Sequence, residues 1–185
     1  MRENKGKSLV ENLDNYTVVD IETTGLSSST SKIIEISAIK IRNKKEVDTF
    51  SMLINPHRPL SYFIKNLTGI TDEMLELASE IEEVLIKFKE FLGSDIILGH
   101  NVNFDVNFLY DNFKEYLGYD LTNDFVDTLR ISRRVLANLS HHTLDDLVEY
   151  YGITARDKHR ALNDCDLTNQ VYLQMCKNLD EIVIN

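Results

Sequence analysis

The chain has 185 residues, of which 43% are hydrophobic and 27% are charged, and its formal net charge is −10. This length suits a single domain with a sizeable core. No run of about 18 apolar residues is present, which argues against a membrane span, and no dense Lys/Arg block is present, which argues against tight charge-driven binding of long duplex nucleic acid. The polar first 15 residues lack the apolar stretch of a signal peptide, so we expect a cytoplasmic protein with no membrane partner.

The first half of the chain predicts three strands joined by short connections. Apolar residues alternate in 16–22 and in 32–42, and residues 46–54 form a third strand after a hairpin turn at Asn43–Lys45. The segment NPHRP at 55–59 stops that strand. A short helix follows from residue 60, is interrupted at Gly69, and is succeeded by another helical turn.

The second half predicts helices that alternate with short strands. Ser79 and Glu82 match a capping box for a helix that ends at Gly93. DIILGH at 95–100 is a short buried strand, residues 103–118 form an amphipathic helix, and residues 124–136 form a strand that enters a helix with Asp127 as its N-cap. Thr143 caps the next helix, and residues 159–179 form the last one. Both cysteines, Cys165 and Cys176, fall in that helix too far apart for a disulfide, so we expect reduced thiols.

Three antiparallel strands followed by helical crossovers predict an α/β protein with a mixed five-stranded sheet flanked by helices. We expect residues 1–15 to be a polar N-terminal extension, residues 16–178 a single domain, and residues 179–185 a short C-terminal tail.

Two carboxylates stand one residue apart at the end of the first strand, in VVDIETTG. Because side chains of a strand alternate between its two faces, Asp20 and Glu22 point the same way and repel each other. Cations would compensate that repulsion. Three further residues occupy positions near the predicted helix starts, where they could complete a site: Asp105 in GHNVNFD, and His159 and Asp164 in HRALNDCD.

This set of residues suits phosphodiester hydrolysis. Two divalent cations about 3.5–4 Å apart can activate water and neutralise the departing oxygen. Hard cations such as Mg²⁺ or Mn²⁺ prefer carboxylate oxygens, and a histidine can accept the proton of the attacking water. Each residue also has an ordinary structural interpretation, such as a solvated strand edge or a helix-dipole partner. We interpret Asp127 as a helix cap, His141–His142 as a loop pair, and Cys165 as a packed thiol.

The three segments VVDIETTG, GHNVNFDVNFL and HRALNDCD resemble, in order, the three motifs of the DEDDh branch of the DnaQ-like 3′–5′ exonucleases. The resemblance spans residues 16 to about 176. The segment NPHRPLSYFIKNLTGITDEML is also similar to the corresponding part of the proofreading domain of Gram-positive-type replicative polymerases, which is related to the DNA polymerase III epsilon subunit.

The resemblance implies an RNase H-like fold and removal of nucleotides from a 3′ end with two Mg²⁺ or Mn²⁺ ions. It implies that Asp20 bridges both ions, that Glu22 and Asp164 hold the ion that activates water, and that Asp105 holds the other. His159 resembles the general base. The residues that resemble the grip on the terminal nucleotide are Thr23, Thr24, Gly25 and Leu26, with Ile70 and Phe104 as further pocket walls.

Three functions remain open from the sequence. The first is a DNA-directed 3′–5′ exonuclease, free-standing or in a proofreading complex with a polymerase or clamp partner. The second is an exoribonuclease that trims RNA or short oligonucleotides. It remains open because a protein distinguishes RNA from DNA by a contact to the 2′-OH, and the sequence does not display that contact. The third is a non-catalytic replication or repair adaptor, against which the intact acid set argues. We expect phosphate contacts from Arg130, Arg133, Arg134, Lys158 and Arg160.

Overall fold

The computed structural model describes residues 2–154 and 161–183. Within these residues one mixed sheet of six strands has the order β1-β6-β5-β2-β3-β4. The strands are β1 (Ser8–Leu9), β2 (Tyr16–Thr23), β3 (Ile33–Arg42), β4 (Lys45–Leu53), β5 (Ile97–Gly99) and β6 (Phe125–Asp127).

The strands β2, β3 and β4 form an antiparallel meander, as predicted. The turn between β3 and β4 contains Asn43 and Lys44, both with positive φ (52° and 60°). Two such residues in succession give a tight turn whose twist matches that of the flanking strands. On its other side β2 pairs in parallel with β5, and β5 pairs in parallel with β6, so the crossovers build the second half of the sheet.

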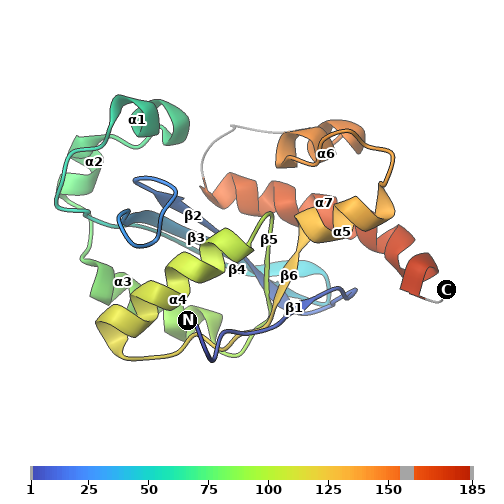
Figure 1. The fold of residues 1–185 in the computed structure, drawn as a ribbon, viewed down its shortest axis with the longest axis horizontal. Helices are drawn as coiled ribbons and strands as arrows, with labels where there is room; N and C mark the ends of the chain where they lie inside the picture. The colour runs from blue at the N-terminus through green and yellow to red at the C-terminus, as the bar shows by residue number, and fades with distance from the viewer. Residues whose placement is uncertain (1, 155–160, 184–185) are drawn as a thin grey trace.

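Helices cover both faces of the sheet (Figure 1). They are α1 (Tyr62–Thr68), α2 (Asp72–Glu76), α3 (Ile81–Leu92), α4 (Asn103–Leu117), α5 (Thr128–Val135), α6 (Leu144–Tyr150) and α7 (Ala161–Val183). Helices α3 and α4 contribute to one buried apolar cluster, and α5, α6 and α7 contribute to the other. A third, smaller cluster lies beneath α1 and α2 against the start of β3.

The alternation of β2 decides which side chains enter which cluster. Val19 and Ile21 join the cluster beneath α3 and α4, whereas Tyr16 and Val18 join the cluster beneath α7. Helix α7 packs against both β2 and β3. Asp20 and Glu22 therefore extend the row of side chains that faces α7.

The strand β1 was not predicted, and it raises the number of strands from five to six. It lies within the first 15 residues and pairs in parallel with β6, Ser8 opposite Phe125 and Leu9 opposite Val126. The backbone comes so close here that a Cβ atom on Gly6 would lie 1.9 Å from the carbonyl oxygen of Asn123. A two-residue strand shows no alternation, so the sequence pattern could not reveal it.

The ends of two helices differ from the prediction. The N-cap of α3 is Glu80, without a side-chain cap, so the predicted capping box of Ser79 and Glu82 is wrong. Ser79 instead forms a bridge with Ile54, and its carbonyl accepts a hydrogen bond from Asn55. Helix α7 continues to Val183, into the segment predicted as a tail.

Other local predictions are confirmed. Helix α1 ends at Gly69 and α3 ends at Gly93, both with positive φ. Thr143 caps α6 in a reciprocal capping box with Asp146. Both cysteines are free and buried. None of the helices in the part of the chain that the structure describes is long and apolar enough to cross a membrane.

Candidate active site

The centre of the candidate site lies on the face of β2 that α7 covers. Asp20 lies opposite Ser37 of β3, and Glu22 lies opposite Glu35. Directly opposed residues of antiparallel strands share a face, so the two predicted acids meet a third carboxylate and a hydroxyl there.

Helix α7 brings Asp164 to the same place. Asp164 lies in the first turn of α7, and its carboxylate, with those of Asp20 and Glu22, offers oxygen atoms that all lie within 4.8 Å of one another. The Cys165 thiol is fully buried and donates to the Ser37 carbonyl at 3.5 Å, which holds the start of the helix on the sheet. Three acids from two distant segments therefore converge.

Asp105 approaches from the opposite layer. It lies in the first turn of α4, is only 5% exposed, and its Oδ1 accepts a hydrogen bond from the backbone N–H of Ile21 at 3.1 Å. Burial raises the pKa of Asp105 to about 8, with further contributions from the charges of Asp127 and Glu22 and opposition from backbone hydrogen bonds. The bond to Ile21 fixes Asp105 directly beside Asp20 and Glu22 in the strand.

In the part of the chain that the structure describes, the carboxylates of Asp20, Glu22 and Asp105 lie close together with raised pKa values. Burial, followed by the charges of Asp105 and Glu22, raises the pKa of Asp20 well above its usual range. Burial, with the charges of Glu35 and Asp164, raises the pKa of Glu22 to about 7. Among the described residues, no ion pair joins Asp20, Glu22 or Asp105 to a lysine or arginine. Such a set fits hard divalent cations, which bind carboxylate oxygens and lower their pKa.

The predicted general base lies outside the described residues. His159 belongs to the segment 155–160 that directly precedes α7, as do Lys158 and Arg160, which were predicted to contact phosphates. Helix α7 begins at Ala161, so His159 stands two residues before the helix that carries Asp164.

The loop after β2 places the predicted nucleotide contacts beside the acids. The Thr23 hydroxyl donates to the Gly25 carbonyl at 2.7 Å, which tightens the turn. The Thr24 hydroxyl accepts from the backbone N–H of Lys32 and from the Arg58 guanidinium. Leu26 lies in this braced loop with 89% of its surface exposed.

The two residues predicted to line the nucleotide pocket, Ile70 and Phe104, differ in their exposure. Ile70 has no exposed surface and packs in the small cluster with Ile34 and Ile64, so it cannot contact a nucleotide in this structure. The sequence pattern missed this because Gly69 turns the chain inward immediately before it. Phe104 is half-buried, and its ring lies 4.8 Å from that of Phe108.

Two acids next to the site were not predicted to belong to it. Glu35 is 1% exposed, and its Oε1 accepts from the Ser51 hydroxyl at 3.1 Å. The available signal was a single acid within the apolar run IIEIS, on the same face as Asp20. Asp127 caps α5 as predicted, through Leu129 at 3.0 Å, and its charge also acts on Asp105. Burial raises the pKa of Asp127.

Comparison with known proteins decides the family. The family described as Exonuclease (RNase_T) matches residues 17–172, which include nearly all of β2, all of α4 and the first half of α7. The chain belongs to this exonuclease family. The match confirms the resemblance drawn from the three motifs and the prediction that the protein is an exonuclease.

The curated relatives are proteins much longer than this chain. A PolC-type DNA polymerase III of Caldanaerobacter subterraneus is 44% identical over 169 residues, and one of Staphylococcus epidermidis is 43% identical over 171 residues. The matches cover 91% and 92% of this chain but only 12% of each relative. The exonuclease therefore corresponds to a small segment of each polymerase.

Solved structures share the fold. Exonuclease X in complex with a 5′-overhanging duplex DNA superposes with a TM-score of 0.70 at 23% identity, covering 90% of this chain and 98% of that one. E. coli Exonuclease I with a bound oligonucleotide gives a TM-score of 0.79 at 16% identity, covering 92% of this chain and 43% of that one. These likenesses confirm the predicted mixed α/β fold.

Proposed function

We propose that this exonuclease removes nucleotides from the 3′ end of DNA by metal-dependent hydrolysis. The observation that carries the proposal is the cluster of Asp20, Glu22 and Asp164, whose carboxylate oxygens approach within 4.8 Å at the carboxyl end of β2. In open α/β sheets, ligands bind beyond the carboxyl ends of the strands. The 16–178 segment would act as one exonuclease domain.

The four acids would together bind two cations, either Mg²⁺ or Mn²⁺. The charges of Asp105, Glu22 and Asp164 all act on Asp20, which suits a ligand shared by both ions. Glu22 and Asp164 would hold the first ion, and Asp105 the second. Two bound cations supply an activated water and neutralise the charge that develops on the departing oxygen.

The protein side chains supply the proton transfer and the positioning. His159 is proposed to accept the proton of the attacking water, since an imidazole changes charge near neutral pH. The backbone of Thr23, Thr24 and Gly25 would hold the terminal nucleotide. Leu26 would pack against its base, because an 89% exposed leucine on a braced loop has apolar surface to bury.

DNA is favoured over RNA as the substrate because the curated relatives are named as DNA polymerases. The same relatives support a polymerase or clamp as partner, with a proofreading role, and a cytoplasmic location. The Exonuclease X structure contains duplex DNA with an overhang, which supports a DNA end as the ligand. An exoribonuclease would need the same acids and cations, and it would differ only in how it contacts the sugar of the substrate.

The proposal is tested by incubating the purified protein and Mn²⁺ with matched single-stranded DNA and RNA, each labelled at its 5′ end. We expect a ladder that shortens from the 3′ end, faster for DNA. Asp20→Ala should abolish it, and the exposed Glu90→Gln on α3 is the matched control that should leave it unchanged.

Each outcome of this assay has a meaning. Faster cleavage of RNA would replace the DNA proposal with the exoribonuclease alternative. Cleavage that persists in Asp20→Ala would remove Asp20 from the metal site. No cleavage of either strand, with or without an added polymerase, would favour the non-catalytic adaptor.

A further inference from the structure

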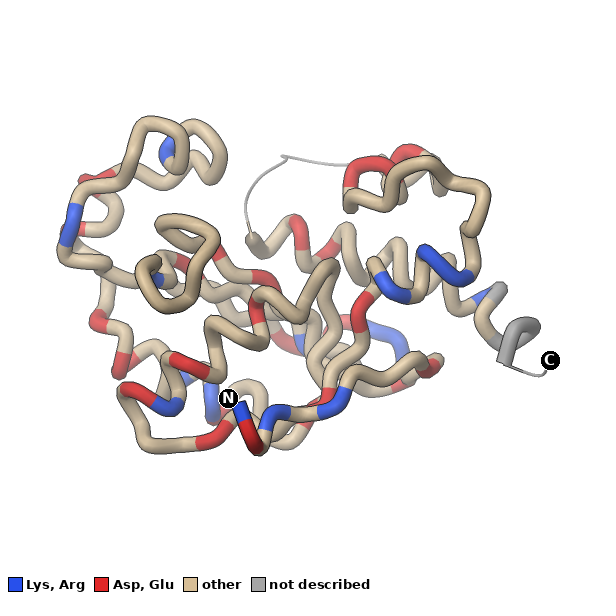
Figure 2. The backbone as a smooth tube through the Cα atoms, in the orientation of Figure 1, with Lys and Arg blue, Asp and Glu red and all other residues tan. Residues whose placement is uncertain are grey.

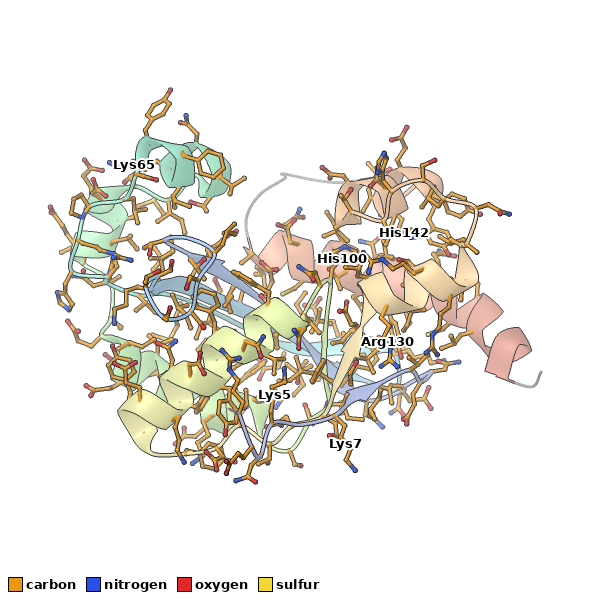
Figure 3. All side chains as sticks on the ribbon, in the orientation of Figure 1. Lys5, Lys7, Lys65, His100, Arg130 and His142 are labelled. Atoms are coloured by element: carbon orange, nitrogen blue, oxygen red, sulfur yellow. The ribbon has the colours of Figure 1, made fainter. Side chains whose placement is uncertain are left out.

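A cavity opens between the end of β5, the start of α5 and the loop that leads into α6. Its volume is about 670 Å³. Figure 3 shows His100 and His142 lying close together where these elements meet. The polar residues that line it and matter here are His100, Asn101, Arg133, Ser140, His141 and His142.

The two labelled histidines are fixed parts of the wall. His100 Nδ1 lies 3.0 Å from the Thr128 hydroxyl, and the same ring is hydrogen-bonded to the backbone of His142. His142 Nδ1 lies 3.0 Å from the Ser132 hydroxyl. Both rings are thereby tied to α5, which gives the cavity a defined shape.

The mouth of the cavity carries hydrogen-bond donors. Arg133 is exposed, and no ion pair among the described residues involves it. Figure 2 shows the basic positions along α5, whose arginines are Arg130, Arg133 and Arg134. Of the two acids in the first turn of α6, Asp146 already accepts from the backbone N–H and hydroxyl of Thr143. This lining therefore offers hydrogen-bond donors and a positive charge to an anion, although the chain as a whole has ten more acidic than basic residues.

The cavity is connected to the active site through one carboxylate. Asp127 Oδ1 accepts from the backbone N–H groups of Asn101 at 2.9 Å and Leu129 at 3.0 Å, both of which line the cavity. Asp127 is also the foremost neighbouring charge acting on Asp105. Asn101 has a φ of 55°, a left-handed conformation that asparagine tolerates and that the bond to Asp127 holds in place.

We propose that this cavity binds an internal phosphate of the substrate strand, on the 5′ side of the terminal nucleotide. The inference rests on the proposed function, because it assumes that the strand's 3′ end occupies the acidic cluster. Arg133 would provide the charged contact, since a guanidinium matches the geometry of phosphate oxygens. Among the described residues of the lining there is no Phe, Tyr or Trp, and the two histidine rings tied to α5 already face hydroxyl groups of that helix, which favours the phosphate over the base.

Arg133 and Arg134 provide a matched pair for the test. Both are exposed and adjacent on α5, but only Arg133 lines the cavity. The binding of a fluorescent single-stranded DNA decamer is measured by anisotropy with Ca²⁺ over a range of salt, and gels verify that the strand stays intact. We expect Arg133→Gln to weaken binding about tenfold at low salt and to reduce the salt slope by about 0.7. Arg134→Gln removes the same charge outside the cavity, so it should weaken binding and reduce the salt slope clearly less than Arg133→Gln does.

A second readout separates this inference from the proposed function. Hydrolysis of the p-nitrophenyl ester of thymidine 5′-monophosphate with Mn²⁺ reports the acidic cluster alone, because this substrate has no internal phosphate. Both arginine variants should hydrolyse it like the unmodified protein. If the unmodified protein hydrolyses neither ester nor oligonucleotide while Arg133→Gln still weakens binding, the proposed function fails and the phosphate site stands. Equal binding by Arg133→Gln and the unmodified protein, or equal losses in both variants, would overturn the phosphate site.

Discussion

Replacing Glu22 with glutamine should stabilise the metal-free protein and abolish its stabilisation by Mg²⁺. Burial and the charges of Glu35 and Asp164 raise the pKa of Glu22 from 4.5 to about 7. A carboxyl with a higher pKa in the folded chain binds its proton more tightly there. Stability therefore falls as pH rises from 4.5 to about 7, and the loss is complete above that pH.

The size of the effect follows from that difference in pKa. At about 1.4 kcal/mol for each pH unit, ionised Glu22 costs about 3 kcal/mol of folding free energy. Because glutamine keeps the shape but also has a polar amide to desolvate, we expect a gain of about 1–3 kcal/mol at pH 8. For a chain of this length that gain raises the melting temperature by about 3–10 °C.

Metal should stabilise the two proteins to different extents. At a Mg²⁺ concentration of about 100 times its Kd, the unmodified protein gains about 2.7 kcal/mol, whereas Glu22→Gln lacks a ligand and gains little. The stability advantage of Glu22→Gln seen in EDTA should therefore shrink or reverse when Mg²⁺ is added.

Circular dichroism melts between pH 5 and 8.5, in EDTA and in Mg²⁺, measure both effects. The exposed Glu90→Gln serves as the control for removal of one negative charge from this acidic chain. The reasoning is refuted if Glu22→Gln is less stable than the unmodified protein in EDTA at pH 8, or if Mg²⁺ stabilises both proteins equally.

Three further predictions concern other residues. His159→Ala should slow single-turnover cleavage by about 10²–10⁴-fold while keeping the Mg²⁺-dependent rise in melting temperature, and an unchanged rate would contradict its role as base. Leu26→Ala should raise KM for oligonucleotides without lowering stability, because Leu26 is 89% exposed; an unchanged KM would remove it from the nucleotide site. Burial lowers the pKa of His100 to about 4, so the unfolded chain binds an extra proton between pH 6.5 and 4. His100 alone should therefore lower stability by about 3 kcal/mol over that range, against the gain from Glu22, and acid titrations of His100→Gln should lack this contribution.

Local rules predicted much of the fold and the position of the acids. The alternation of β2 placed Asp20 and Glu22 on one face, and the structure has them in the row that faces α7. Asp127 and Thr143 cap their helices as their side chains predicted, and Asn43 begins the tight turn. These features depend on residues close together in the sequence.

Features that depend on distant contacts were missed. The strand β1 exists because Ser8 and Leu9 find β6 more than 100 residues away. Ser79 loses its capping role because it pairs with Ile54, and Ile70 is enclosed by side chains of β3 and α1. Glu35 was overlooked because a lone acid in a strand usually faces solvent, whereas here β2 and α7 enclose it.

The most direct test of the account is a crystal structure with Mn²⁺ and a nucleoside 5′-monophosphate, in which anomalous scattering locates each ion. The account predicts two Mn²⁺ ions about 3.5–4 Å apart at the end of β2. Asp20 should contact both ions, Glu22 and Asp164 one of them, and the nucleotide should lie against Leu26. No ion at the carboxylate cluster, or ions bound only at other acidic residues, would contradict it.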